Sequence, residues 1–427
     1  MPAISTTRTT SSRPADAAAP FRLLPPPGTG PVGLSAHIAR YGVPPYGSPQ
    51  HVVTEVRDAG LAGHGGAAFP THRKLISVAE AGRRTGRTPV AVANGAEGEP
   101  ASFKDKTLLR DAPHLVLDGL QLAAEAVGAG EAHLAIEAGT GLRAPLTAAI
   151  AKRAEHGADL LPVRLTEVPR RFLSGQSSAL AEHLSGRPAL PRYQRPPVRE
   201  RGVGRAPTLV QNAETLAHLA LIARYGAAWF RSAGTEDEPG SMLCTVHAAG
   251  HRPWVTEAAF GTPLRQLVPL DSGVQAVLVG GYHGIWIPAG QAAGLRLSAA
   301  DLGSPGAGVL AALPADRCGL VETARVLRYL ALQSAGQCGP CLNGLPRIAA
   351  AFSTLAERGP GGDAVRDDIA RWAGLVEGRG ACHHPDGTVR LVRSALTVFA
   401  GEIDEHGRGY CRGAGGAPLL PVPAEEY

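Results

Sequence analysis

The chain has 427 residues, of which 44% are hydrophobic and 19% charged, and its length predicts about two to four domains. No apolar run approaches the roughly 18 residues needed to cross a bilayer, which predicts a soluble protein that is not itself transmembrane. The formal net charge is +5, but nucleic-acid binding is not expected, because the basic residues are scattered and aromatic residues make up only 5%.

Residues 1–35 are predicted to form a disordered tail, because Ser, Thr, Pro and Ala dominate there. No apolar stretch follows the arginines of this tail, so it lacks the pattern of a secretory signal. Cysteines at positions 244, 318, 338, 341, 382 and 411 then fit a reducing compartment. We therefore expect a cytoplasmic protein that reaches a membrane only through a partner.

An α/β domain is expected over residues 36–235. Apolar residues recur at helical spacing in 48–63 and 111–130, whereas 87–95 and 131–139 have the composition of buried strands. Helices and strands that alternate in this way predict a largely parallel sheet.

Two regions with different secondary-structure patterns follow the α/β domain. Residues 236–312 contain short strands, most clearly at 274–288, and predict a small β-rich module. Residues 313–413 predict a four-helix bundle with short connections, and residues 414–427 a terminal tail. The four helical segments of the bundle are 320–336, 346–359, 364–378 and 392–407.

A glycine-rich segment, GHGGAAFPT at 63–71, lies between two predicted helices, and Lys74 follows it. Glycines let backbone N–H groups approach a phosphate, and a lysine neutralises its charge. The same composition is typical of a glycine-rich linker. A phosphate-binding loop and a linker therefore both remain open at this point.

Polar side chains crowd after the strand at 87–95. At its expected carboxyl end, where open α/β sheets bind their ligands, lie Asn94, Glu97, Glu99, Lys104 and Asp105. A solvated loop is the alternative interpretation of this stretch.

Three cysteines form a candidate metal site. SAGQCGPCLNG contains Cys338 and Cys341 as a C-x-x-C pair, and Cys382 follows in GACHHPDG. Zinc and a cubane iron–sulfur cluster each take four ligands, so a purely thiolate site lacks one. An iron–sulfur cluster, a zinc ion with His383 or His384 as fourth ligand, and no metal are all compatible with these residues.

The other three thiols are interpreted as core residues. Cys244 falls within a strand pattern, Cys318 opens the first predicted helix of the bundle and Cys411 follows the last. Cys411 reaches the metal site only if the ends of the bundle meet.

Four motifs, in the same order, resemble the flavoprotein, NADH-binding F subunit of complex I. GHGGAAFPTHRKL is similar to the family's GRGGAGFPTGxKW, NGAEGEPASFKDK to NADEGEPGTxKDR, LVQNAETLA to VNNVETLA, and SAGQCGPCLNG to ESCGxCxPCREG. His72, Leu75, Gly95 and Ala96 instead resemble the C subunit of the Rnf electron-transport complex. The chain is therefore interpreted as a divergent branch between the two.

This resemblance implies an α/β domain that binds FMN and NADH, a β-grasp module of the soluble-ligand-binding type, and a four-helix bundle that carries a 4Fe-4S or 3Fe-4S cluster. It implies that FMN accepts a hydride from NADH and passes single electrons through the cluster, with no catalytic acid or base on the protein. The residues that match the family's cofactor site are Gly63, Gly65, Gly66, Phe69, Lys74, Asn94, Glu97, Gly175, Asn212 and Thr215, and the matching cluster ligands are Cys338, Cys341 and Cys382.

Several family site residues are replaced in this chain. Ala335 stands at the first cluster cysteine, His64 at the loop arginine and Ala96 at an aspartate of the flavin pocket. Gln176 and Ser177 stand at two consecutive glutamates beside the flavin. The replacements leave open whether NADH oxidation and a cluster are retained.

Two functions follow from these patterns. The first is a cytoplasmic NADH:acceptor oxidoreductase whose acceptor is a redox partner, such as a ferredoxin or a membrane electron-transfer complex. The second is a non-enzymatic adaptor or electron carrier that has lost NADH oxidation and holds zinc or no metal in its bundle. The intact glycine loop and Lys74 favour the first.

Overall fold

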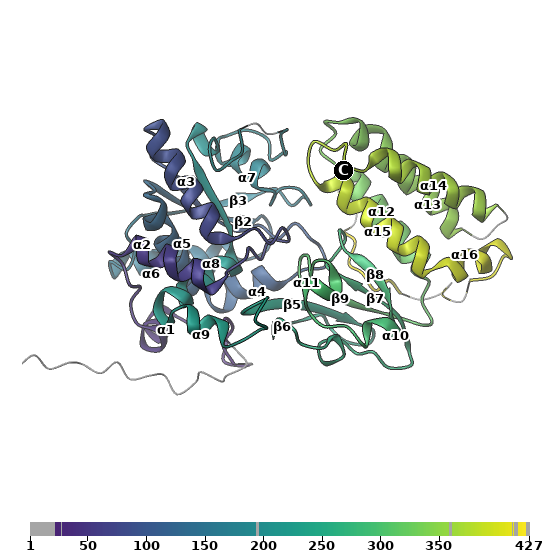
Figure 1. Cartoon of the computed structure of the whole chain (residues 1–427), viewed down its shortest axis with the longest axis horizontal. Coiled ribbons are helices and arrows are strands. Elements are labelled where there is room, and N and C mark those ends of the chain that lie inside the picture. The colour runs from purple at the N-terminus through teal and green to yellow at the C-terminus, as the bar shows by residue number, and fades with distance from the viewer. Residues whose placement is uncertain are drawn as a thin grey trace, which may run out of the picture.

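Three regions follow one another along the chain, coloured from purple to yellow in Figure 1. The computed structural model describes residues 22–26, 28–193, 196–357, 361–411, 413 and 417–423. An α/β region comes first, a five-stranded mixed sheet second and a group of helices last. Among the described residues, no helix is both long and apolar enough to cross a membrane.

The first sheet has four parallel strands in the order β3-β2-β1-β4. β1 and β2 are runs of mostly buried, largely apolar residues, as a sheet covered on both faces requires. The parallel sheet expected from the alternating pattern is confirmed. The strands are Val90–Gly95 (β1), Glu131–Glu137 (β2), Val163–Val168 (β3) and Thr208–Asn212 (β4).

Helices pack around this sheet (Figure 1). Both α2 and α5 begin with a proline and end before a glycine with positive φ, Gly60 or Gly128, which are common start and stop signals. The helices are α1 (Leu34–Tyr41), α2 (Pro49–Ala59), α3 (Thr71–Thr85), α4 (Lys104–Asp111), α5 (Pro113–Val127), α6 (Arg143–Glu155), α7 (Ser177–Leu184), α8 (Ala213–Tyr225) and α9 (Ala227–Arg231).

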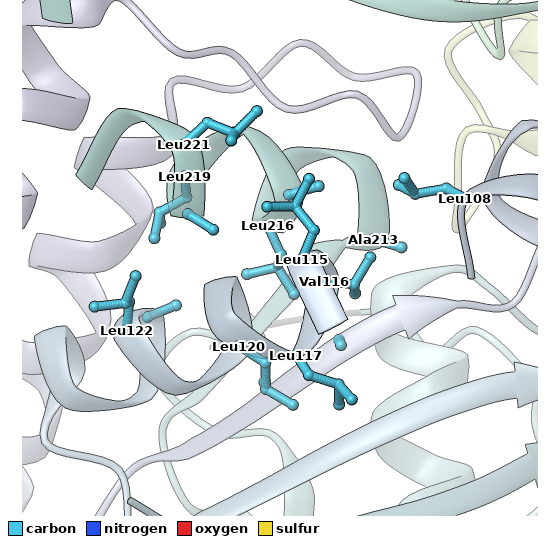
Figure 2. Packing of buried hydrophobic residues seen from close by; sticks show 14 of the residues in the cluster. Leu108, Leu115, Val116, Leu117, Leu120, Leu122, Ala213, Leu216, Leu219 and Leu221 are labelled. Carbon is cyan, nitrogen blue, oxygen red and sulfur yellow. The ribbon is translucent and has the colours of Figure 1, made fainter. Parts of the chain in front are cut away.

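The packing of α5 against α8 forms the centre of the core, as Figure 2 shows. α5 is buried on nearly all sides, because its sequence is apolar all round, and Leu115 and Leu117 are fully buried. The two helices touch at Gly119, where an added Cβ would overlap the main chain of Leu216. Only glycine fits at this crossing.

The second region is a mixed sheet in the order β6-β5-β9-β7-β8. β5 and β9 are parallel, and the other neighbouring pairs are antiparallel. These are the short strands expected here, with the segment 274–288 as a hairpin of β7 and β8. The elements are β5 (Ser241–Ala248), β6 (Trp254–Ala259), β7 (Val274–Val279), β8 (Ile285–Pro288), α10 (Ala289–Ala292), α11 (Ala299–Leu302) and β9 (Val309–Pro314).

The third region is helical, but the last of its four expected helices is two helices in the structure. α15 begins at His384, where Pro385 suits the first helical turn, and it ends at Val398, so that Phe399 separates it from α16. The expectation of four helices is corrected accordingly. The helices are α12 (Gly319–Leu332), α13 (Leu345–Ala356), α14 (Gly362–Val376), α15 (His384–Val398) and α16 (Ala400–Gly407).

Both expected tails are shorter than their compositions suggested. Leu23 is fully buried, and its backbone N–H donates to the Glu257 carboxylate at 2.9 Å. Near the other end, Leu420 is buried and the Pro421 carbonyl accepts from the Tyr282 hydroxyl at 2.6 Å. A single pair of leucines among prolines and glycines in each tail gives no periodic signal, so only tertiary packing reveals them. Residues 1–21 lie outside the described part of the chain.

Replacing Gly119 with alanine should lower the free energy of unfolding by about 3 kcal/mol or more, because the methyl group has to push α5 away from α8. Gly374→Ala is the matched control, since Gly374 lies in α14 with no atom near an added Cβ. This control should be neutral or stabilising by up to about 1 kcal/mol. Equal effects in denaturant unfolding would contradict the close crossing.

Candidate functional site

The carboxyl ends of β1 and β4 lie side by side and carry two of the polar residues that the sequence singled out. Asn94, in β1, is in register with Asn212, at the end of β4. The glycine segment reaches the same place, since a Cβ on Gly65 would lie 3.6 Å from the Asn212 Cβ. This edge of a parallel sheet is the usual ligand position in α/β folds.

The glycine segment folds into an exposed loop with free donors. Gly63 donates its N–H to the Phe69 carbonyl at 3.0 Å, and Gly66 and Ala68 have φ values of 91° and 46°. The N–H groups of Gly65 and Gly66 donate to no other group in the described part of the chain, and both residues are exposed. Unpaired N–H groups on a glycine loop fit an anion such as a phosphate.

His64, which stands at the family's loop arginine, is buried behind this loop. Its backbone N–H donates to Thr215 Oγ1 at 2.8 Å, and its ring Nε2 lies 3.2 Å from the Ser241 carbonyl. The ring packs 4.9 Å from that of His218. Burial lowers the pKa of His64, so the loop has no fixed positive charge at this position.

Lys74, in α3, is directed to β4. Its Nζ donates to the Val210 carbonyl at 3.1 Å and to Gln211 Oε1 at 2.8 Å. Burial, with a smaller effect of Arg199, lowers the pKa of Lys74 to about 8. No carboxylate of the described residues pairs with this ammonium, so its charge is available to an anionic ligand.

Two loops are pressed together beside Asn94. The Asn94 amide donates to the Gly175 carbonyl at 2.8 Å, and an added Cβ on Gly175 would lie 2.5 Å from the Ala96 carbonyl oxygen. Gln176, at a family glutamate position, accepts from Ser178 N at 2.8 Å and caps α7. Gln176 therefore caps α7 without the negative charge that a glutamate would carry at this position.

Glu97 is buried and caps α4. Its carboxylate accepts from the backbone N–H groups of Asp105 and Lys106, each at 3.2 Å, and from Ser102 Oγ at 2.5 Å. Burial, followed by the nearby Asp105 charge, raises the pKa of Glu97. The side chain thus holds the loop after β1 against the start of α4.

A buried ion network fixes Asn212. Lys104 Nζ lies 2.8 Å from Asp105 Oδ1 and 2.7 Å from Glu214 Oε2, and all three side chains are buried. Asp105 Oδ2 accepts from the Asn212 amide at 2.7 Å, and Glu214 Oε1 accepts from Leu243 N at 2.7 Å. Burial opposes the charge on Lys104, but the two carboxylates outweigh it and raise the pKa of Lys104. Glu214 was missed from the sequence, because it lies far from Lys104 along the chain.

An aromatic cluster that the sequence also did not predict joins the cofactor loops to the helical region. Phe172 packs 4.7 Å from the ring of His283 and 5.5 Å from that of His384. His283 Nε2 lies 3.0 Å from His384 Nδ1, and His384 Nε2 lies 2.8 Å from the Leu330 carbonyl. Since Cys382 is two residues before His384, the loop at 172–176 packs against the segment that carries this cysteine.

The cysteine site is assembled from two segments. Cys338 and Cys341 lie on either side of the start of a π-helical turn, Pro340–Gly344, with their sulfurs 3.5 Å apart. The charge on Cys382 contributes to raising the pKa of Cys341, after burial and Cys338, as expected for neighbouring thiols. One small ion would require the three sulfurs to lie close together. They are not all within 4.8 Å of one another. Three soft sulfur donors around a wider space fit a cluster better than a lone zinc ion.

Two cavities lie beside the loops of the first region. A cavity of about 540 Å³ is lined by the glycine loop, including Gly63 and Gly66, and by Arg390. A second, of about 740 Å³, lies between the loops after β1, β2 and β3 and the helix α12, with Glu137 as its acidic residue. Its basic lining residues are Lys106, Arg170, Arg171, Arg325 and Arg328.

Two family models match this chain, one in the first region and one in the helical region. The family model for the Nuo51 FMN-binding domain matches residues 56–221, and that for the NADH-ubiquinone oxidoreductase-F iron-sulfur binding region matches residues 322–406. A second F subunit of NADH-quinone oxidoreductase from Rhizobium meliloti is 30% identical over 383 residues, which cover 84% of this chain and 89% of that protein. The chain belongs to the family of NADH-quinone oxidoreductase F subunits.

Further relatives agree with this membership. The F subunit of NADH-quinone oxidoreductase from Escherichia coli K12 is 29% identical, with 84% of each chain covered. A solved NAD⁺-reducing [NiFe]-hydrogenase in its H₂-reduced state superposes with a TM-score of 0.77 at 29% identity. The match covers 84% of this chain but 63% of the hydrogenase chain, so the present chain spans less than two thirds of that protein.

The resemblance inferred from the four motifs is therefore confirmed. The chain is a flavoprotein of the NADH-oxidising, electron-transfer type, with an FMN-binding domain and an iron–sulfur binding region. The type of cluster, and the roles of the individual residues, remain predictions.

Replacing Lys104 with methionine should lower the free energy of unfolding by about 3–5 kcal/mol, because two buried carboxylates lose their cation. Lys152→Met is the matched control, since Lys152 forms an exposed pair with Glu155 at 3.3 Å. The control should cost less than about 1 kcal/mol in denaturant unfolding. A Lys104 variant as stable as the control would contradict the network.

Proposed function

We propose that this chain is the NADH-oxidising component of an electron-transfer enzyme and that it holds FMN at the carboxyl ends of β1 and β4. The observation that carries the proposal is the pair of unpaired N–H groups at Gly65 and Gly66, beside Asn212 and within the matched FMN-binding region. These donors would hold the phosphate, and Lys74 would balance its charge. The residues assigned to FMN and NADH are Gly63, Gly65, Gly66, Phe69, Lys74, Asn94, Glu97, Gly175, Asn212 and Thr215.

When bound, FMN supplies the conversion of a hydride from NADH into single-electron transfers. The protein contributes position and electrostatics. Asn94 is held by the Gly175 carbonyl at the end of β1, and Asn212 is held by Asp105 at the end of β4. With Ala96, Gln176 and Ser177 in place of acidic residues, this site carries less negative charge than its relatives.

The cluster is assigned to Cys338, Cys341 and Cys382. Ala335 offers no ligand, and both ring nitrogens of His384 already have partners. His383 is exposed next to Cys382 and is the side chain available for a fourth bond. A 4Fe-4S cluster would take His383 or solvent as its fourth ligand, whereas a 3Fe-4S cluster needs no fourth protein ligand.

The domain layout follows the family. Residues 36–235 form the flavin domain, 236–312 a β-grasp module and 313–413 the iron–sulfur bundle. The acceptor is a redox partner such as a ferredoxin or a membrane electron-transfer complex, reached from the cytoplasm. An acidic partner surface is favoured, because the charged side chains that line the 740 Å³ cavity between the first region and α12 are basic except for Glu137.

A second candidate is an adaptor that has lost the cofactors. Its specific support is the change of a cluster cysteine to Ala335 and the use of Gln176 as a neutral helix cap. Anaerobic purification with flavin, iron and sulfide analysis separates the two. Bound FMN, about three to four iron atoms per chain, and flavin absorbance that bleaches with NADH support the oxidoreductase. Colourless protein that does not respond to NADH would support the adaptor and contradict the oxidoreductase.

Cysteine and lysine variants should separate the two cofactors. Cys382→Ser should remove most of the iron and sulfide while FMN is retained, whereas Lys74→Met should weaken FMN binding while iron is retained. Cys244→Ser, a buried thiol in β5, is the control for both. Loss of FMN in the Cys382 variant alone would contradict two independent sites.

FMN affinity should fall as the pH rises above about 8. Lys74 is protonated below its lowered pKa of about 8, so its attraction for a phosphate is present at neutral pH and is lost at higher pH. The loss is at most about tenfold per pH unit. Lys74→Arg, which stays charged, should bind FMN with no such step in a fluorescence titration. A step of equal size in both proteins would mean that a group other than Lys74 causes the pH dependence.

A further inference from the structure

A second group of metal-ligating side chains lies at the end of α12 opposite to Cys338. Cys318 caps the start of α12 and is 3% exposed. Its sulfur lies 3.5 Å from His406 Nε2 and 3.2 Å from Glu402 Oε2. Cys411 completes the group, because the ligand atoms of Cys318, His406 and Cys411 all lie within 4.8 Å of one another.

These separations suit one small cation. Zinc bonds of about 2.3 Å to sulfur and about 2.0 Å to nitrogen, at tetrahedral angles, set the sulfur and nitrogen about 3.5 Å apart. The Cys318–His406 distance has this value without any rearrangement. The cluster ligands differ in this respect, since the sulfurs of Cys338, Cys341 and Cys382 do not form such a compact group.

The other ring nitrogen of His406 is oriented as in many metal sites. Nδ1 lies 3.3 Å from the Leu355 carbonyl, which can accept only if Nδ1 carries the hydrogen. Nε2 then presents a lone pair toward Cys318 and Cys411. Backbone carbonyls commonly orient metal-binding histidines in this way.

The protein atoms alone do not satisfy this group. A Cys318 thiol has one hydrogen, but it faces acceptors on both Glu402 and His406. Glu402 is 5% exposed, and its Oε1 is buried with no hydrogen-bond partner in the described part of the chain. A buried carboxylate oxygen without a partner is costly, and a bound cation would satisfy it.

The backbone also holds Cys411 close to α12. An added Cβ on Gly413 would overlap the backbone nitrogen of Cys318, so Gly413 lies directly against the start of α12. The thiols of Cys318 and Cys411 thus come from opposite ends of the helical region, fixed by main-chain packing rather than by a flexible terminus.

We propose that Cys318, His406 and Cys411 bind a structural zinc ion that ties α16 and the end of the helical region to the start of α12. Glu402, whose carboxylate lies beside Cys318 but outside this compact group of three, turns in as the fourth donor. A set of four donors made of two cysteines, a histidine and a carboxylate is a closed zinc site, which leaves no position for substrate. The site does not depend on FMN or on the iron–sulfur cluster.

Metal analysis of the full-length protein tests this proposal. Wild-type protein grown with zinc should contain about one zinc ion per chain, and Cys318→Ser/Cys411→Ser should contain less than a tenth of that amount. Cys244→Ser should keep its zinc, since Cys244 is also buried but belongs to neither compact group of ligand atoms among the described residues. Cys382→Ser should keep zinc as well, which separates this site from the cysteines of the cluster.

A cobalt titration covers the case in which a variant folds poorly. Protein stripped by a chelator should bind Co²⁺ with a thiolate-to-cobalt charge-transfer band, and His406→Gln, with both thiols intact, should bind it at least tenfold more weakly. Zinc added back should raise the melting temperature of stripped wild-type protein and leave that of His406→Gln unchanged. Wild-type protein without zinc, zinc retained in the double cysteine variant, or a Cys318–Cys411 disulfide in place of two free thiols would each overturn the proposal.

Discussion

The buried contact of Lys104 with Asp105 and Glu214 is the interaction on which the cofactor site depends. It joins α4, α8 and, through the N–H of Leu243, the first strand of the second sheet. Asp105 in turn holds the amide of Asn212 at the end of β4. Charges buried in this way have no water to replace a lost partner, so the three elements keep one relative position.

Close backbone contacts complete this geometry and explain which substitutions the family site tolerates. Gly175 leaves no room between two loops, and Gly119 leaves none between α5 and α8. The replaced residues, by contrast, keep a structural role: Gln176 still caps α7, and His64 fills the interior behind the glycine loop. Gln176 and His64 thus fill structural positions without a fixed charge.

Cysteines that are candidate metal ligands lie at both ends of α12 for different reasons. Cys338 and Cys341 follow its carboxyl end, and His384, two residues after Cys382, packs with the Phe172 and His283 rings. Cys318 lies at its amino end, where Cys411 and His406 return to it. The sequence pattern favoured core thiols at Cys318 and Cys411, because 92 intervening positions give no local signal that two chain ends meet.

The sequence by itself determined the parallel sheet, the glycine loop, the C-x-x-C pair and the family, because each depends on local periodicity or on motifs of contiguous residues. Only the tertiary structure decided that Glu214 balances Lys104, that His64 faces inward and that three aromatic rings join the two sites. It also decided that residues 22–26 and 417–423 pack against the protein. All of these are contacts between residues distant in the chain, whose partners are chosen by packing and burial and leave no pattern in neighbouring residues.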